Sequence, residues 1–76
     1  MSDTEKPVVR RSIEDVQGRL CVDIFERPDG TFGFEEWRRD AEDSGRWQRI
    51  GNFSERRFVN ADLAHAAAEA AIVWLT

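Results

Sequence analysis

Apolar residues crowd the last part of the chain, where residues 60–75 have the composition of a helix. Ala is the best helix former, no Gly or Pro interrupts the run, and Asn60 is a good N-cap residue. When successive residues are turned by about 100°, one stripe carries Leu63, Ala66, Ala67, Ala70 and Trp74. We predict that this stripe packs on the core. The opposite side, which is only half polar, holds His65, Ala68, Glu69 and Ile72.

Between residues 20 and 39 the apolar positions recur with a period of two, which is typical of β-strands. Residues 20–27 and 31–39 are the two strands of a predicted hairpin. Pro28, Asp29 and Gly30 are its turn, because Pro fixes φ and Gly accepts a positive φ. A three-residue turn places Arg27 opposite Thr31. The register then gives these facing pairs: Ile24 and Phe34, Val22 and Glu36, Phe25 and Gly33, Cys21 and Trp37.

Residues 40–46 are polar and predict a loop, and residues 47–53 predict a third strand. The predicted fold class is therefore α+β: a three-stranded antiparallel meander with one C-terminal helix packed on one face, in the order β-β-β-α. We expect residues 19–76 to form a single small domain. A chain of 76 residues buries a small core, and dimerisation is a common remedy for that.

Residues 1–18 show no clear periodicity and predict a flexible N-terminal arm. Two local structures are compatible with the second half of this segment. Ser12 can cap a short helical turn that ends before Gly18. In the other structure, the apolar residues of the segment lie extended against the domain: Val8, Val9, Ile13 and Val16.

The alternation of residues divides the predicted sheet into two faces. The face that the helix should cover is almost wholly apolar and holds Leu20, Val22, Ile24, Phe32, Phe34 and Ile50. The other face mixes Cys21, Phe25, Trp37, Trp47 and Phe53 with Asp23, Glu35, Arg39 and Arg49. One helix covers only one face of a sheet. Because aromatic residues and Arg are enriched at protein interfaces, the second face predicts a binding surface.

The sequence also carries information on the cellular location of the protein. No apolar run approaches the roughly 20 residues that span a membrane. The first residues lack the apolar segment of a signal peptide. Cys21 is the single cysteine, so an intrachain disulfide is excluded. These features predict a cytoplasmic protein.

The net charge of −4 argues against a nucleic-acid partner, because such binding depends on neutralising phosphates. Residues 38–57 are the exception, with 6 basic and 4 acidic side chains. In and beside this region, Trp37, Arg39, Trp47 and Arg49 predict an alternative function, the binding of single-stranded nucleic acid by stacking and phosphate contacts. We favour packing over that function, since the acidic neighbours compete with phosphate for the guanidinium groups.

No stretch carries a catalytic signature, and we expect no enzymatic activity, cofactor or metal. His65 and Glu69 form an i, i+4 pair, but the chain has no second His for a metal site. Cys21 and His65 match a nucleophile and a base in type only, because Cys21 lies in the middle of a strand. Asp23 and Glu35 are predicted cross-strand neighbours that either pair with arginines across an interface or stay solvated at the sheet margin.

Two resemblances come from these segments. The Ala-rich run 66–75 after three strands resembles the last helix of double-stranded-RNA-binding domains. That family has a Lys-rich loop at this helix, where the present chain has Glu55, Arg56 and Arg57 before the cap and Asp62 in the first turn, so the likeness implies architecture alone. Residues 28–40, followed by Trp47 and the Ala-rich helix, are similar to small bacterial proteins of unknown function, and this implies no activity.

Together the patterns predict a protein-interaction module that forms a homodimer or binds a larger protein. The predicted interface residues are Phe25, Trp37, Arg39, Trp47, Arg49 and Phe53. In a twofold dimer, Asp23 and Glu35 of one chain are expected to face Arg39 and Arg49 of the other. The alternative contact is the back of the helix, with Ala68, Ile72 and Leu75.

Overall fold

The hairpin at the centre of the sheet forms as its turn predicts. In the computed structural model, which describes residues 6–40 and 45–75, β2 (Leu20–Glu26) and β3 (Phe32–Arg39) are antiparallel. The Arg27 N–H donates to the Thr31 carbonyl at 2.7 Å, and Gly30 has a φ of 89°. The Asp29 carboxylate accepts from the Thr31 N–H and hydroxyl at 3.0 and 2.7 Å. Every facing pair predicted from this turn is confirmed.

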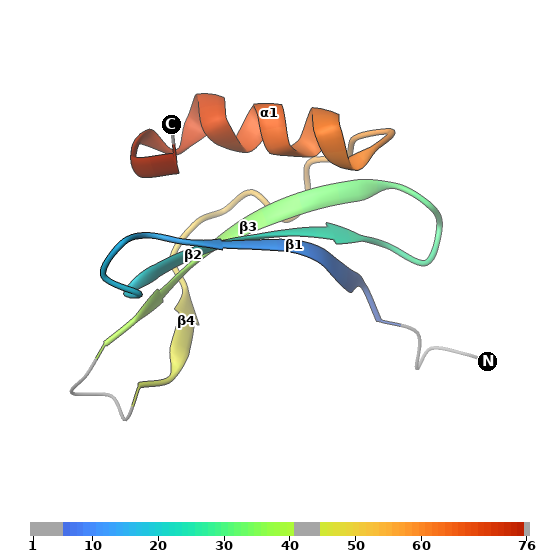
Figure 1. Cartoon of the computed structure of the whole chain (residues 1–76). Coiled ribbons are helices and arrows are strands. Elements are labelled where there is room, and N and C mark those ends of the chain that lie inside the picture. The colour runs from blue at the N-terminus through green and yellow to red at the C-terminus, as the bar shows by residue number, and fades with distance from the viewer. Residues whose placement is uncertain (1–5, 41–44, 76) are drawn as a thin grey trace.

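Four strands, rather than three, make up the sheet. They are β1 (Val8–Glu14), β2, β3 and β4 (Trp47–Arg49), paired in the order β1-β2-β3-β4 with every pairing antiparallel. The helix α1 (Ala61–Ala71) and the 3₁₀ turn η2 (Val73–Leu75) lie across one face of this sheet (Figure 1). The α+β class and the C-terminal helix are thus confirmed. The described helices are too short and insufficiently apolar to cross a membrane.

The fourth strand, β1, comes from the segment assigned to the arm. Of the two alternatives for this segment, the extended one is observed for Val8–Glu14, which pairs with β2. The register shifts between Val9 and Arg11, so a bulge interrupts the alternation from which a strand is recognised. The Asp15 carboxylate then closes the turn by accepting from the N–H groups of Arg19 and Leu20 at 2.9 and 3.2 Å.

The third predicted strand is shorter than expected, since β4 ends at Arg49 instead of residue 53. The N–H groups of Ile50 and Gly51 both donate to the carbonyl of Glu36, at 3.1 and 3.4 Å, and this ends the regular ladder. The alternation assumed for 47–53 fails there. Ile50 is 43% exposed instead of buried under the helix. Phe53 stacks on Phe34 in the core with ring centroids 4.9 Å apart, so its prediction for the other face is wrong.

The helix begins as predicted, but the face that packs on the sheet is centred on other residues. Of the predicted stripe, Ala67 and Trp74 pack against the core, whereas Leu63, Ala66 and Ala70 are exposed. The Asn60 side chain caps it by accepting from the Leu63 N–H at 2.8 Å. Ala64 and Ala68 are fully buried, whereas Leu63 is 49% exposed. The regular helix also stops early, because Ile72 is extended and η2 follows. Small Ala side chains allow the helix backbone to approach the sheet closely, and the larger Leu63 is left outside.

The core lies between the helix and the sheet. Its buried members are Val22, Ile24 and Phe34 from the sheet, together with Ala64, Ala68 and Ile72 from the C-terminal segment. The helix therefore covers the face of the sheet that was predicted for it. Phe53 and Phe58 come from the segment between β4 and α1 and complete this core.

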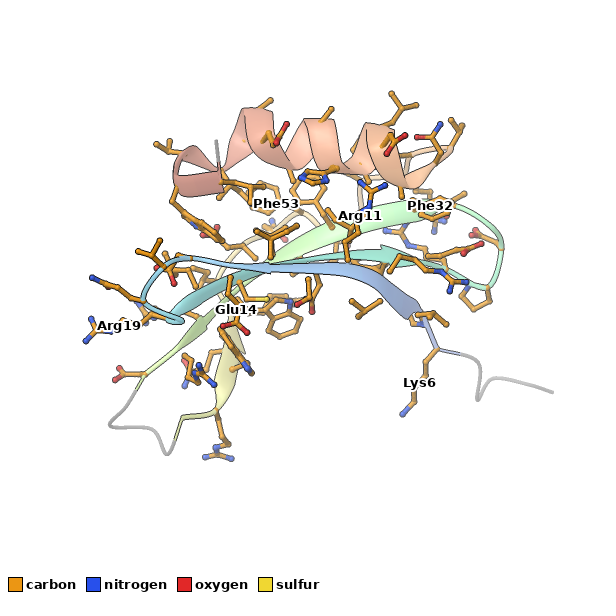
Figure 2. All side chains as sticks on the ribbon, in the orientation of Figure 1. Lys6, Arg11, Glu14, Arg19, Phe32 and Phe53 are labelled. Atoms are coloured by element: carbon orange, nitrogen blue, oxygen red, sulfur yellow. The ribbon has the colours of Figure 1, made fainter. Side chains whose placement is uncertain are left out.

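Arg11 fastens the edge strand β1 to the helix. Its Nη2 donates to the Asp62 carboxylate at 2.7 Å, and its Nη1 lies 2.9 Å from His65 Nδ1. Figure 2 shows Arg11 directed from β1 toward the helix. His65 Nε2 is 3.6 Å from Glu69, so the expected i, i+4 contact is present, although His65 is half-buried and not on the solvent side.

Candidate functional site

The side of the sheet that α1 does not cover, here called the helix-free face, carries a charge gradient across all four strands. Facing residues of an antiparallel sheet point to the same side. Glu14 of β1 faces Cys21, Cys21 faces Trp37, and Trp37 faces Arg49 of β4. These four residues therefore form one row, acidic at the β1 edge and basic at the β4 edge.

Arg39 and Trp47 occupy the next position along β3 and β4, where they face each other. The Arg39 guanidinium lies 4.5 Å from the centroid of the Trp47 ring, which is a cation–π contact. It also donates to the carbonyl of Gly18 at 2.8 Å. Arg39 therefore covers one side of the Trp47 ring and is itself held by the monomer.

Cys21 forms a small polar cluster with its neighbours in place of a reactive centre. Its sulfur lies 3.2 Å from the Ser12 hydroxyl and 3.4 Å from the Asp23 carboxylate, and Ser12 donates to Asp23 at 2.9 Å. Burial, assisted by the nearby carboxylates of Asp23 and Glu14, raises the pKa of the Cys21 thiol. A thiol with a raised pKa stays protonated, so it is a poor nucleophile.

Glu35 is withdrawn from the helix-free face by the segment that follows β4. Its side chain is 2% exposed. One carboxylate oxygen accepts from the N–H groups of Phe53 and Ser54 at 3.3 and 3.1 Å, and the other accepts from the Glu36 N–H at 3.0 Å. Asp23 and Glu35 are cross-strand neighbours as expected. The Glu35 carboxylate, however, already accepts hydrogen bonds from three backbone N–H groups of its own chain.

Two open hollows flank Trp37 on this face. One of about 300 Å³ is lined by Ser12, Glu14, Cys21, Asp23, Trp37 and Trp47. The other, of about 220 Å³, is more apolar and is lined by Val9, Phe25, Trp37 and Arg49 with neighbouring residues. The indole nitrogen of Trp37 is buried, yet it finds no acceptor among the residues that the structure describes.

Five of the six predicted interface residues lie on the helix-free face: Phe25, Trp37, Arg39, Trp47 and Arg49. Phe53 does not, as described above. Phe25 is only 9% exposed, and the Arg27 guanidinium lies 5.0 Å from its ring centroid. Phe25 therefore offers little of its own surface to a partner.

Sequence reasoning missed the contribution of β1 to this face, which is Val9, Ser12 and Glu14. The alternative in which Val8, Val9, Ile13 and Val16 lie extended against the domain is the signal that could have indicated it, although Val16 lies beyond β1 and is fully exposed.

Comparison with models of protein families, with curated proteins and with solved structures gives no match. The chemistry of the face must therefore be judged from its own residues.

The structure separates the residues that were considered as candidates for chemistry. Cys21 lies on the helix-free face, whereas His65 contacts Arg11 on the helix side, so the two are not brought together. Within residues 6–40 and 45–75, no three His, Cys, Asp or Glu side chains gather as metal ligands would. Trp37, Trp47, Arg49 and Glu14 form a surface with aromatic area and both signs of charge, as interfaces have.

Proposed function

We propose that this chain is a cytoplasmic protein-interaction module that binds a second copy of itself through the helix-free face. The row from Glu14 to Arg49 carries the proposal, because it is acidic at one end and basic at the other. A surface of that kind is complementary to itself under a twofold rotation.

The rotation axis that fits this row runs parallel to the strands and passes between Cys21 and Trp37. It sets Glu14 of each copy against Arg49 of the other, so two ion pairs flank the centre. At the centre, Cys21 of each copy then faces Trp37 of the other. Sheets that pack face to face keep their strands within about 30° of each other, which suits this arrangement.

Trp37 supports the same proposal through its position near the centre of the row. In the proposed dimer, its ring packs on the polar cluster of Cys21, Ser12 and Asp23 of the second copy. Tryptophan is enriched at protein interfaces, which is the place this side chain takes in the dimer.

Single-stranded nucleic acid is the alternative ligand for Trp37, Arg39, Trp47 and Arg49, which share this face. Two features favour self-association. Arg39 already covers one side of Trp47, which reduces its stacking surface. Glu14 and Asp23 line the same hollow and repel phosphate.

A charge exchange tests the proposed dimer. We expect sedimentation equilibrium at about 100 µM, where a weak dimer is populated, to give a mass of a dimer or larger for the wild type. Glu14→Arg and Arg49→Glu should each raise the dissociation constant about tenfold or more, because like charges then face each other, and the double variant should restore it. Glu69→Arg, on the helix, is the control and should leave the mass unchanged.

A monomeric wild type at this concentration would contradict the proposal, and so would a double variant that fails to restore association. Trp37→Ala leaving the dimer intact would move the interface to another surface. That surface cannot be the back of the helix considered from the sequence, because Ala68 and Ile72 are buried in the core. Titration with single-stranded oligonucleotides at low salt addresses the alternative, which requires an affinity that falls as salt is raised.

A further inference from the structure

The outer edge of β1 is a second feature that the proposed function does not use. β1 is seven residues long and ends the sheet on one side, with no other described strand beyond it. It contains no Pro, and Val8 and Val9 are 50% and 52% exposed. The opposite edge, β4, has only three residues. Long uncovered edges are templates for another strand, so β1 is the edge at which strand addition is expected.

We propose that a second copy of this chain adds its own β1 to this edge in antiparallel orientation, giving a continuous eight-stranded sheet. Charge decides both the occupant and the direction. Basic residues occupy the beginning of the segment, namely Lys6, Arg10 and Arg11, and the acidic residues Glu14 and Asp15 end it. Antiparallel pairing of two copies sets each basic half beside an acidic half. Parallel pairing would set like charges together.

Symmetry restricts the register of this pairing. The twofold axis is perpendicular to the sheet, so each residue and its copy point to the same side of the sheet. Facing residues of an antiparallel pair also point to the same side. One residue of β1 must therefore lie at the axis and face its own copy. An axis at Arg11 would oppose two guanidinium groups. An axis at Ile13 would oppose two side chains that each pack against the core of their own monomer. An axis at Ser12 opposes two exposed hydroxyl groups and pairs Arg11 with Ile13, within the regular part of β1.

This edge contact is compatible with the dimer through the helix-free face. A perpendicular axis keeps both helices on one side of the extended sheet and both helix-free faces on the other. The edge contact leaves Trp37 and Arg49 uncovered, whereas Glu14 takes part in both contacts, opposite Arg10 at the edge and opposite Arg49 on the face. Arg49→Glu therefore tests the helix-free face alone, and the cysteine pairing below tests the edge alone. The failure of one contact does not decide the other.

Cysteine pairing at the axis provides the test, because only a residue on the axis meets its own copy. The Ser12 hydroxyl is 3.2 Å from Cys21, so Cys21→Ser is made first to prevent an intrachain disulfide. In that background we expect Ser12→Cys to form a covalent dimer under mild oxidation at about 100 µM, since facing residues lie about 4.5–5.5 Å apart. Reduction should reverse it, and Trp37→Ala should not abolish it.

Glu14→Cys in the same background is the matched control. It lies on the same face, but its copy is displaced by four residues, roughly 13 Å, which a disulfide does not span. It should remain monomeric on a non-reducing gel. Equal cross-linking of both variants, or none with Ser12→Cys, would overturn the proposal. Cys21→Ala serves as a second background, and circular dichroism establishes that each variant is folded before oxidation.

Discussion

Glu35 shows how one side chain can fix a segment without any regular structure. Its carboxylate gathers backbone N–H groups from β3 and from residues 53 and 54, while being almost completely buried. Gly51 makes the approach possible, because a Cβ there would lie 2.5 Å from a Glu35 oxygen. The path of the chain from β4 to the helix therefore depends on this pair of residues.

Replacing Glu35 by Gln should destabilise the protein by about 1–3 kcal/mol, because an amide NH₂ then meets backbone donors in a buried site. The free energy of unfolding in urea measures this. Glu55→Gln, at an exposed position, should change it by less than about 0.5 kcal/mol. A loss for Glu35→Gln no larger than that of the control would show that the carboxylate does not hold the segment.

The sequence predicts individual contacts correctly where the residues that make them are close together in the chain. The turn at Pro28 to Gly30 fixes the whole β2–β3 register, and Asn60 fixes the start of the helix. The partners of Glu35 are backbone groups 18 and 19 residues away, and these leave no pattern in the sequence. Phe53 was misplaced for the same reason.

At the scale of elements, the helix shows the limit of periodicity. Because apolar residues occur on every side of α1, a periodicity of 100° per residue does not single out the face that packs on the sheet. The structure buries Ala64 and Ala68, whose small size lets the helix lie close to Phe34. The bulge in β1 similarly concealed a strand. In both elements the conformation depends on contacts with the sheet. The sheet selects which face of α1 is buried, and pairing with β2 makes residues 8–14 a strand.

The orientation of α1 can be tested by replacing one buried and one exposed Ala with Leu and comparing the stability of the two variants. Ala68→Leu introduces a large side chain into a packed core and should cost about 1–3 kcal/mol of stability. Ala66→Leu lies on the exposed side and should change stability by less than about 0.5 kcal/mol, since Leu and Ala both favour helix. Thermal unfolding followed by circular dichroism measures both. The opposite order would restore the face predicted from the sequence.

For the whole molecule, three aspartates link stability to pH. The Thr31 N–H and hydroxyl, followed by Arg57, lower the pKa of Asp29, and Arg11 lowers the pKa of Asp62. Burial acts to raise the pKa of Asp15, but backbone N–H groups, first that of Leu20, outweigh it and the net pKa is lowered. Each group binds a proton more weakly in the folded state than in the unfolded chain.

Lowered carboxyl pKa values stabilise the fold above the ordinary value of 3.8, and this contribution is lost as the pH falls below it. We expect the urea midpoint to be level from about pH 7 to pH 5 and to fall between about pH 4 and pH 2. Asp29→Asn should be less stable at neutral pH and should lose less on acidification. An equally steep fall in that variant would show that Asp29 contributes nothing to the acid dependence.

The architecture at this scale was largely predictable. Period-two and helical segments identify the α+β class, and the cleaner apolar face of the hairpin identifies the side that the helix covers. The composition of the strands predicted a binding surface on the face that the helix leaves uncovered. Five of the six predicted interface residues lie on that face. Its charge gradient depends on Glu14, which only the fourth strand adds. The role of the face in association stays a prediction.

The Trp residues, which are the source of the intrinsic fluorescence, lie on both sides of the sheet. The chain has three Trp residues and no Tyr, so its emission comes from Trp alone. Trp74 donates to Glu36 at 2.8 Å on the helix side, whereas Trp37 and Trp47 belong to the helix-free face. A chain that keeps only Trp74 reports optically on how the end of the helix docks. A chain that keeps only Trp37 reports on whatever occupies the opposite side, without an added label.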